Sequence, residues 1–273
     1  MNVFWNKKGL VAKVVMHLLF KKQFGYKQAL PLNIIGKTII GRDNSRIDLA
    51  WSATQEFPVK GIVLTCHPFL KYGMHYSFKH KISDIYLKQS YHVVFFNFKG
   101  FGGSTVNGPS FADDILSVKD WIIEQFPGFP IYLHGFSFGG YHALHAMRME
   151  PDVFEAAIFD SVPILIDRFF NSGFIGYVMR WLSRSPLASI SGTETVLPAL
   201  SEINGKSVLF IYGSNDPYIT RYDLEALKTA FPDALIHMVE GRSHLESHKC
   251  NNDIYNSVIM TFLNSLREMQ LVS

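Results

Sequence analysis

Short apolar runs alternate with longer segments of mixed polarity along most of this 273-residue chain. The apolar runs are rich in Val, Ile and Phe and nearly continuous, a pattern typical of strands buried on both faces of a parallel sheet. Six such strands are predicted, at residues 61–68, 92–98, 131–136, 154–161, 207–213 and 234–241. Two further stretches, 33–41 and 46–53, are separated by a polar turn and predict a hairpin that adds an antiparallel edge.

The segments between these strands carry apolar residues at three- and four-residue spacing, which indicates helices with one buried face. Helices are predicted at 77–89, 112–126, 137–149 and 252–269. The alternation of strands and helices predicts an α/β fold with helices on both faces of a mostly parallel sheet. Open sheets of this kind bind ligands at the carboxyl ends of their strands, so candidate chemistry is expected there.

Composition narrows the class of protein only slightly. A chain with 48% hydrophobic and 18% charged residues suits one globular domain with a large core. The formal net charge of +3 is too small to indicate a nucleic-acid partner. The two cysteines, Cys66 and Cys250, lack C-x-x-C spacing, so free thiols in a reducing, cytoplasmic compartment are expected.

Residues 1–30 are predicted to form a helical extension of a main domain at 31–273. An apolar stretch from Leu10 to Phe20 lies between two pairs of lysines and is shorter than the ~20 apolar residues of a membrane-spanning helix. No small-residue cleavage site follows it, which argues against a signal peptide. Two interpretations stay open: a helix packed on the domain, or a helix in the interface at the inner face of a membrane.

A serine follows the predicted strand at 131–136, within the sequence G-F-S-F-G that begins at Gly135. This fits the pattern G-x-S-x-G, in which a sharp strand-to-helix turn exposes the serine hydroxyl at the positive end of a helix. Gly135 and Gly139 would give the turn room. The pattern is short enough to arise by chance in an ordinary glycine-rich turn, so its meaning depends on partners elsewhere in the chain.

A serine nucleophile needs a base, and the base needs a carboxylate that fixes its tautomer. His244 follows the last predicted strand and is the favoured base, while His248 is expected to begin the terminal helix or to meet solvent. Asp216 follows the strand at 207–213 and is the favoured acid; Asp160, at another strand end, is the alternative. The order Ser137, Asp216, His244 is the one that α/β-hydrolase triads follow along the chain.

A tetrahedral intermediate also needs two backbone donors for its oxyanion. The N–H group of Phe138, directly after the serine, is one candidate. The second is expected in the loop after the strand at 61–68, where Pro68 has no N–H group and Phe69 becomes the candidate. His67 is interpreted as a residue that shapes this loop.

On these residues the chain resembles the α/β-hydrolase superfamily, over residues 33 to 266. The sequence N-F-K-G-F-G-G-S at 97–104 is similar to the superfamily's R-G-x-G-x-S loop, with Lys99 in place of the arginine. The resemblance implies a Ser-His-Asp hydrolase or acyl transferase that needs no cofactor.

Within the superfamily, the sequence C-H-P-F-L-K-Y-G-M at 66–74 resembles a group of bacterial hydrolases. Their oxyanion strand ends in H-P-H-P and is followed by G-G-x-M. Here Phe69 stands in place of the second histidine and Tyr72 in place of one glycine, so the sequence departs from that pattern at two positions.

The resemblance also implies an insertion at about 162–205 that shapes an acyl pocket. This region is strongly apolar, and it is interpreted either as a lid over a hydrophobic pocket or as a helix packed on the core. Its candidate pocket residues are Phe169, Phe174 and Trp181. A short helix at 197–203 would then lead into the next strand.

Three functions remain in competition. The first is hydrolysis of an ester or thioester with an apolar acyl group, the second is a peptidase or amidase on the same triad, and the third is a non-catalytic binding protein. His142 and His145 are three residues apart on a predicted helix, but no acidic partner accompanies them, so no metal is expected. The natural substrate and the oligomeric state stay open.

Overall fold

The computed structural model describes residues 29–31, 33–108, 110–164, 196–203, 205–249 and 252–272. Within them the chain forms an eight-stranded sheet in the order β1-β2-β4-β3-β5-β6-β7-β8. The strands are β1 Ile35–Ile40, β2 Arg46–Ser52, β3 Gly61–Cys66, β4 Tyr91–Phe96, β5 Ile131–Phe136, β6 Phe154–Asp160, β7 Ser207–Gly213 and β8 Leu235–Val239. Strands β3 to β8 pair in parallel, and β2 joins β4 in the antiparallel sense, as does β1 with β2.

This architecture confirms the predicted α/β class, the mostly parallel sheet and the antiparallel hairpin at its edge. The strands β3 and β5 are buried at every position, as their continuous apolar sequences predict. The helices are α3 His75–Lys79, α4 Ile82–Leu87, α5 Ala112–Gln125, α6 Phe138–Met149, α9 Leu197–Glu202, α10 Arg221–Ala230 and α11 Asn252–Val272.

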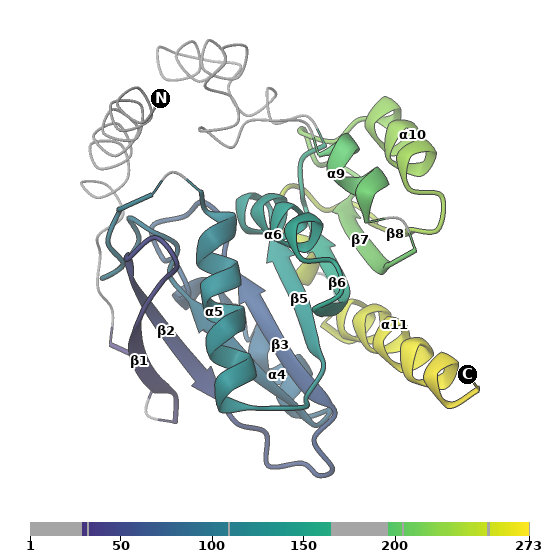
Figure 1. The fold of residues 1–273 in the computed structure, drawn as a ribbon. Coiled ribbons are helices and arrows are strands. Elements are labelled where there is room, and N and C mark those ends of the chain that lie inside the picture. The colour runs from purple at the N-terminus through teal and green to yellow at the C-terminus, as the bar shows by residue number, and fades with distance from the viewer. Residues whose placement is uncertain are drawn as a thin grey trace, which may run out of the picture.

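Helices cover both faces of the sheet, with α5 and α6 on one face and α4 on the other (Figure 1). Each face has its own apolar core. One core joins α5 and α6 to residues of α9 and α10, and the other joins α3, α4 and α11 to the opposite side of the same strands. Because both faces are covered, the carboxyl ends of the central strands remain as the place where polar side chains can gather.

The structure differs from the predicted helices at two places. The single helix predicted at 77–89 is two short helices, α3 and α4, because Lys81 takes a left-handed conformation with φ 54° and breaks the run. Helix α10 has no counterpart among the predicted helices, although its sequence carries a start signal. Thr220 caps it and forms reciprocal hydrogen bonds with Asp223, the capping-box arrangement.

A buried ion pair anchors the loop after β4. Lys99, which replaces the arginine of the resembled loop, is fully buried, and its Nζ lies 2.6 Å from Asp43 and 3.2 Å from Asp114. The backbone N–H group of Lys99 also donates to Asp114. Since a buried cation needs close partners, these two carboxylates explain how a lysine is accommodated at this position.

Several predictions fall outside the described residues. They are the extension at 1–28 with its membrane contact, most of the insertion at 165–195, and the cysteine at 250. Cys66 is a buried free thiol at the end of β3, as expected, and burial raises its pKa. In the part of the chain that the structure describes, no helix is both long and apolar enough to cross a membrane.

Candidate active site

Ser137 lies at a sharp turn between β5 and α6. Its backbone has φ 46° and ψ −114°, a conformation that residues with a side chain rarely adopt. The surrounding structure holds it there, since the Ser137 N–H group donates to the Asp160 carbonyl at 2.8 Å and the Ser137 carbonyl accepts from Tyr141. Strain of this kind persists where the packing fixes it, and it is concentrated at functional sites.

The glycines of the motif are required by close packing around this turn. A Cβ atom on Gly139 would collide with the backbone carbonyls of Cys66 and His67, and one on Gly135 would collide with the backbone of Gly140. Neither obstacle is the end of a flexible side chain. The motif therefore has a steric reason beyond the serine itself: it lets α6 start directly against the end of β3.

The structure brings Ser137, His244 and Asp216 together, as the sequence predicts. His244 Nε2 lies 2.9 Å from Ser137 Oγ, and His244 Nδ1 lies 2.8 Å from Asp216 Oδ2. The second carboxylate oxygen of Asp216 accepts the N–H group of Tyr218 at 2.9 Å. Asp216, with both oxygens engaged, is an acceptor for a proton on Nδ1, which leaves Nε2 to accept the serine hydroxyl.

The loops that carry the acid and the base are joined by backbone contacts. The N–H group of Asn215 donates to the Arg242 carbonyl at 2.8 Å, and that of Ser214 donates to the Val239 carbonyl at 3.0 Å. Gly213 packs so closely that a Cβ atom there would collide with the Arg242 carbonyl. The alignment of Asp216 with His244 is therefore a property of two interlocked loops.

The predicted oxyanion donors lie on the two elements that the sequence assigned to them. Phe138 is the first residue of α6, and Phe69 follows β3; their rings are 5.2 Å apart. His67 shapes the loop after β3, because its Nδ1 contacts the Pro68 carbonyl at 2.8 Å and its Nε2 accepts from the Phe98 N–H group at 3.1 Å. Burial lowers the pKa of His67 to about 4, in keeping with a neutral ring that is donor on one side and acceptor on the other.

The alternative acid, Asp160, has other partners. Its carboxylate accepts hydrogen bonds from the hydroxyls of Ser161 at 2.8 Å and Tyr255 at 2.7 Å. Asp216, in contrast, is hydrogen-bonded to His244 Nδ1. Burial raises the pKa of Asp160 to about 6. The geometry thus favours Asp216 over Asp160 as the partner of the histidine.

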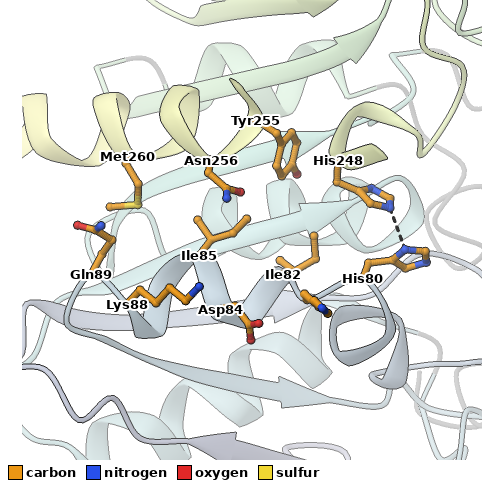
Figure 2. Close-up of a pocket in the computed structure, with 11 residues that line it drawn as sticks. His80, Ile82, Asp84, Ile85, Lys88, Gln89, His248, Tyr255, Asn256 and Met260 are labelled. Carbon is orange, nitrogen blue, oxygen red and sulfur yellow. Dashed lines mark hydrogen bonds between the residues drawn. The ribbon is translucent and has the colours of Figure 1, made fainter. Parts of the chain in front are cut away.

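The expectation for His248 is wrong, because this residue neither meets solvent nor begins the terminal helix. It lies buried in a short 3-10 helix, Ser247–Lys249, with Nε2 3.0 Å from His80 Nδ1. Figure 2 shows this histidine pair at one end of a cleft between α4 and α11, which Tyr255 and Met260 also line. Ser137, Asp216 and His244 do not line this cleft, so it is separate from the candidate site.

The remaining candidate residues are those predicted for an acyl pocket and the two histidines of α6. The candidate pocket residues Phe169, Phe174 and Trp181 lie outside the described residues. His142 is buried on α6 against the rings of Phe111 and Phe138. In the described ranges, no group of three or more His, Cys, Asp or Glu side chains could hold a metal ion.

Comparisons with known proteins bear on the fold and on the class of protein. Residues 58–186 match a family model described as serine aminopeptidase, S33, and residues 193–265 match one described as alpha/beta hydrolase domain containing 18. No curated protein matches the chain.

Among solved structures, an esterase from Pyrococcus furiosus is 18% identical, with a TM-score of 0.70 over 89% of this chain and 96% of that one. An α/β serine hydrolase without lid from Xanthomonas campestris is 19% identical, with a TM-score of 0.61 over 88% and 97%. The thioesterase domain from the curacin biosynthetic pathway is 16% identical, with a TM-score of 0.63 over 84% and 99%.

The sheet order, the strand-to-helix turn at Ser137 and these similarities define an α/β-hydrolase fold, as the sequence predicted. With the two family models on consecutive parts of the chain, the protein belongs to the α/β-hydrolase superfamily.

Proposed function

We propose that this protein is a serine hydrolase that cleaves an ester or thioester through an acyl-enzyme intermediate. The observation that carries the proposal is the pair of hydrogen bonds that joins Asp216 to His244 and His244 to Ser137, at 2.8 and 2.9 Å. A serine hydroxyl is a weak nucleophile, and an adjacent base oriented by a carboxylate is what activates it. The strained turn also places Ser137 at the start of α6, where the positive end of the helix favours negative charge.

In the first half of the reaction, His244 Nε2 takes the proton of Ser137 as Oγ attacks the carbonyl carbon of the substrate. The resulting oxyanion would be held by the N–H groups of Phe138 and Phe69. His244 then returns its proton to the leaving alcohol or thiol, and the acyl group remains on Ser137. Asp216 stays ionised and stabilises the imidazolium in between.

In the second half, water takes the place of the leaving group. His244 accepts a proton from the water as its oxygen attacks the acyl carbon. It then donates this proton to Ser137 Oγ, which leaves as the free serine, and the carboxylic acid departs. The cycle returns the site to its starting state, because each proton that His244 accepts it later gives back.

Support for an apolar acyl group comes from the aromatic residues around Ser137. Phe69 is exposed, with 41% of its surface accessible, and its ring lies 5.2 Å from that of Phe138, the residue after Ser137. Leu70, next in the chain, is 37% accessible. Exposed apolar side chains next to a nucleophile offer a surface on which an acyl chain can be buried. The predicted lid residues Phe169, Phe174 and Trp181 would extend this surface.

Hydrolysis of an amide or peptide is the second candidate. It is favoured by the match of residues 58–186 to the serine aminopeptidase family model. The same triad could carry it, but the acid step is more demanding, because His244 must protonate a leaving amine. A purely binding role is not favoured, since the three triad side chains are all present and aligned. The likeness of the loop at 66–74 to the H-P-H-P hydrolases does not separate these candidates.

The test is a comparison of rates on p-nitrophenyl acyl esters, acyl-thioesters and aminoacyl anilides, with wild type and Ser137→Ala side by side. We expect turnover of esters or thioesters that the substitution lowers by several orders of magnitude. Each buried methylene contributes up to ~0.8 kcal/mol, so kcat/KM should rise several-fold per added pair of carbons until the pocket is full. Faster turnover of anilides would move the proposal to the amidase, and a flat ester series would contradict the apolar acyl group.

A further inference from the structure

The residues Asp160 and Ser161 touch both halves of the candidate site. The Asp160 carbonyl, at the end of β6, accepts the N–H group of Ser137 at 2.8 Å. The Ser161 hydroxyl accepts the N–H group of Leu245, the residue directly after His244, at 3.0 Å. One dipeptide therefore contacts the backbone of the nucleophile turn and the backbone of the base loop.

The carboxylate of Asp160 sets the orientation of the Ser161 hydroxyl. Ser161 donates its only hydroxyl proton to Asp160 Oδ1 at 2.8 Å, so its lone pairs are left for the N–H group of Leu245. Asp160 Oδ2 in turn accepts the hydroxyl of Tyr255, from α11, at 2.7 Å. Both oxygens of this fully buried carboxylate are thereby used.

A series of hydrogen bonds, all donated in the same direction, leads through Tyr255 to the carboxylate of Asp160. Because Tyr255 donates to Asp160, its oxygen can accept the proton of His134 Nε2, at 3.3 Å. His134 Nδ1 then accepts the hydroxyl of Tyr86 at 2.6 Å. Burial lowers the pKa of His134 to about 3, so its ring is neutral and carries the single N–H group that this direction requires.

Backbone strain marks the same contact. Ser161 and Leu245 both have φ 57°, in the left-handed region that residues with side chains seldom occupy. Such conformations cost energy and persist only where neighbouring structure holds them. The two strained residues are joined to each other by the hydrogen bond from Leu245 to Ser161.

We propose that Asp160 and Ser161 are positioning residues that fix the His244 loop against the nucleophile turn, and so set the distance between His244 and Ser137. This inference rests on the proposed function. It gives the buried carboxylate at the end of β6 a task separate from that of Asp216. Burying a carboxylate costs more free energy than burying an apolar residue. The presence of Asp160 is explained if its hydrogen bonds orient the site.

Ser161→Ala tests the proposal, with Ser104→Ala as its matched control. Ser104 is equally buried, and its hydroxyl also accepts a backbone N–H group, from Asp48 at 3.0 Å, and donates to an oxygen, the Asn97 carbonyl at 2.7 Å. Both variants lose one hydrogen-bonding hydroxyl of the same kind. They differ in what the hydroxyl joins: Ser161 links Asp160 to Leu245, whereas Ser104 links the loop after β4 to β2.

The first measurement needs no activity. Hydrogen exchange of peptides that cover 241–249 should speed up at least about tenfold in Ser161→Ala and stay at the wild-type rate in Ser104→Ala. Unchanged exchange in Ser161→Ala would overturn the proposal. Should Ser161→Ala fail to fold, Ser161→Gly removes the same hydroxyl and tolerates the positive φ.

The second measurement is kinetic. In Ser161→Ala, kcat on an acyl ester should fall about ten- to hundred-fold with KM within about two-fold, because a small misplacement of His244 slows chemistry without weakening binding. A kcat equal to that of wild type, or an equal fall in Ser104→Ala, would overturn it. If wild type hydrolyses neither esters nor thioesters, the proposed function fails, and the exchange measurement still decides whether Ser161 holds the loop.

Discussion

At the scale of single residues, the central feature is that two carboxylates, Asp160 and Asp216, lie at the ends of neighbouring strands, and His244 pairs with Asp216. Asp216 contacts His244 Nδ1 directly, whereas Asp160 is linked to the base loop through the hydroxyl of Ser161. The two acids therefore have different expected roles: Asp216 fixes the histidine's tautomer, and Asp160 orients a hydrogen bond that holds its loop.

Isosteric substitutions separate these roles. Asp216→Asn should lower kcat by about 10⁴, since a neutral amide favours the wrong tautomer of His244, as in the protease triad. Asp160→Asn should cost much less, because its amide oxygen can still accept the hydroxyl of Ser161. Steady-state kinetics of both purified, folded variants provide the measurement. A larger loss in Asp160→Asn would move the acid to that position.

The proximity of Ser137, Asp216 and His244 could be predicted because it depends on chain order. Each follows a strand, and parallel strands bring their carboxyl ends to one edge of the sheet. The burial of His248 could not be predicted in the same way. Its partners His80 and Tyr76 lie 168 and 172 positions away in the sequence, and only the packing of α3 against the end of the base loop brings them together.

At the scale of elements, the loops after β3 and β4 support each other. His67 accepts the N–H group of Phe98, and Asn97 accepts that of Met74, so the loop that carries Phe69 is held by the loop that carries Lys99. Lys99 is itself enclosed by Asp43 and Asp114. The ion pair is thus part of the support of one predicted oxyanion donor.

Removing this buried cation should be strongly destabilising. Lys99→Met keeps the volume but leaves two carboxylates without their partner, and breaking a buried pair costs about 3–5 kcal/mol. Chemical denaturation measures the free energy of unfolding. Lys206→Met is the matched control, because its partner Asp152 is 99% exposed at 3.5 Å, and exposed pairs contribute at most about 1 kcal/mol. Equal stability of Lys99→Met and wild type would refute this view of the loop.

Elements could be predicted from the sequence where their pattern was long and uniform. The buried strands and the helices α5, α6 and α11 are of this kind, because a continuous apolar run or a regular stripe leaves little ambiguity. The break at Lys81 had no such signal, since a lysine in a left-handed conformation is imposed by tertiary packing. Helix α10 does have one, the cap at Thr220 with Asp223 three residues later, but such a cap also fits an isolated turn.

At the scale of the whole molecule, buried histidines make the fold sensitive to acid. Burial lowers the pKa of His67, His145 and His248 from an ordinary 6.5 to about 4. It lowers the pKa of His134 to about 3 and that of His142 well below 6.5. Below pH 6.5 these histidines bind protons in the unfolded chain but not in the folded chain. The free energy of unfolding that they leave intact above that pH is therefore lost as the pH falls toward 4.

Each such histidine contributes a slope of up to about 1.4 kcal/mol per pH unit. Two buried acids act in the opposite direction, because burial raises the pKa of Asp114 to about 7 and that of Asp160 to about 6. Five histidines outweigh two carboxylates, so the free energy of unfolding should fall steadily between pH 6.5 and 4.5. Urea denaturation at several pH values measures it. A constant value over this range would contradict the assignment of neutral, buried histidines.

The most direct test of the central claim is covalent labelling of Ser137. A fluorophosphonate reacts with a serine only when a neighbouring base activates the hydroxyl, and the reaction does not depend on knowing the natural substrate. Intact-mass and peptide mass spectrometry of the folded, full-length protein should show one adduct per chain, located on Ser137, and none on Ser137→Ala. The absence of any adduct on folded wild type, or the same labelling of Ser137→Ala, would contradict the account.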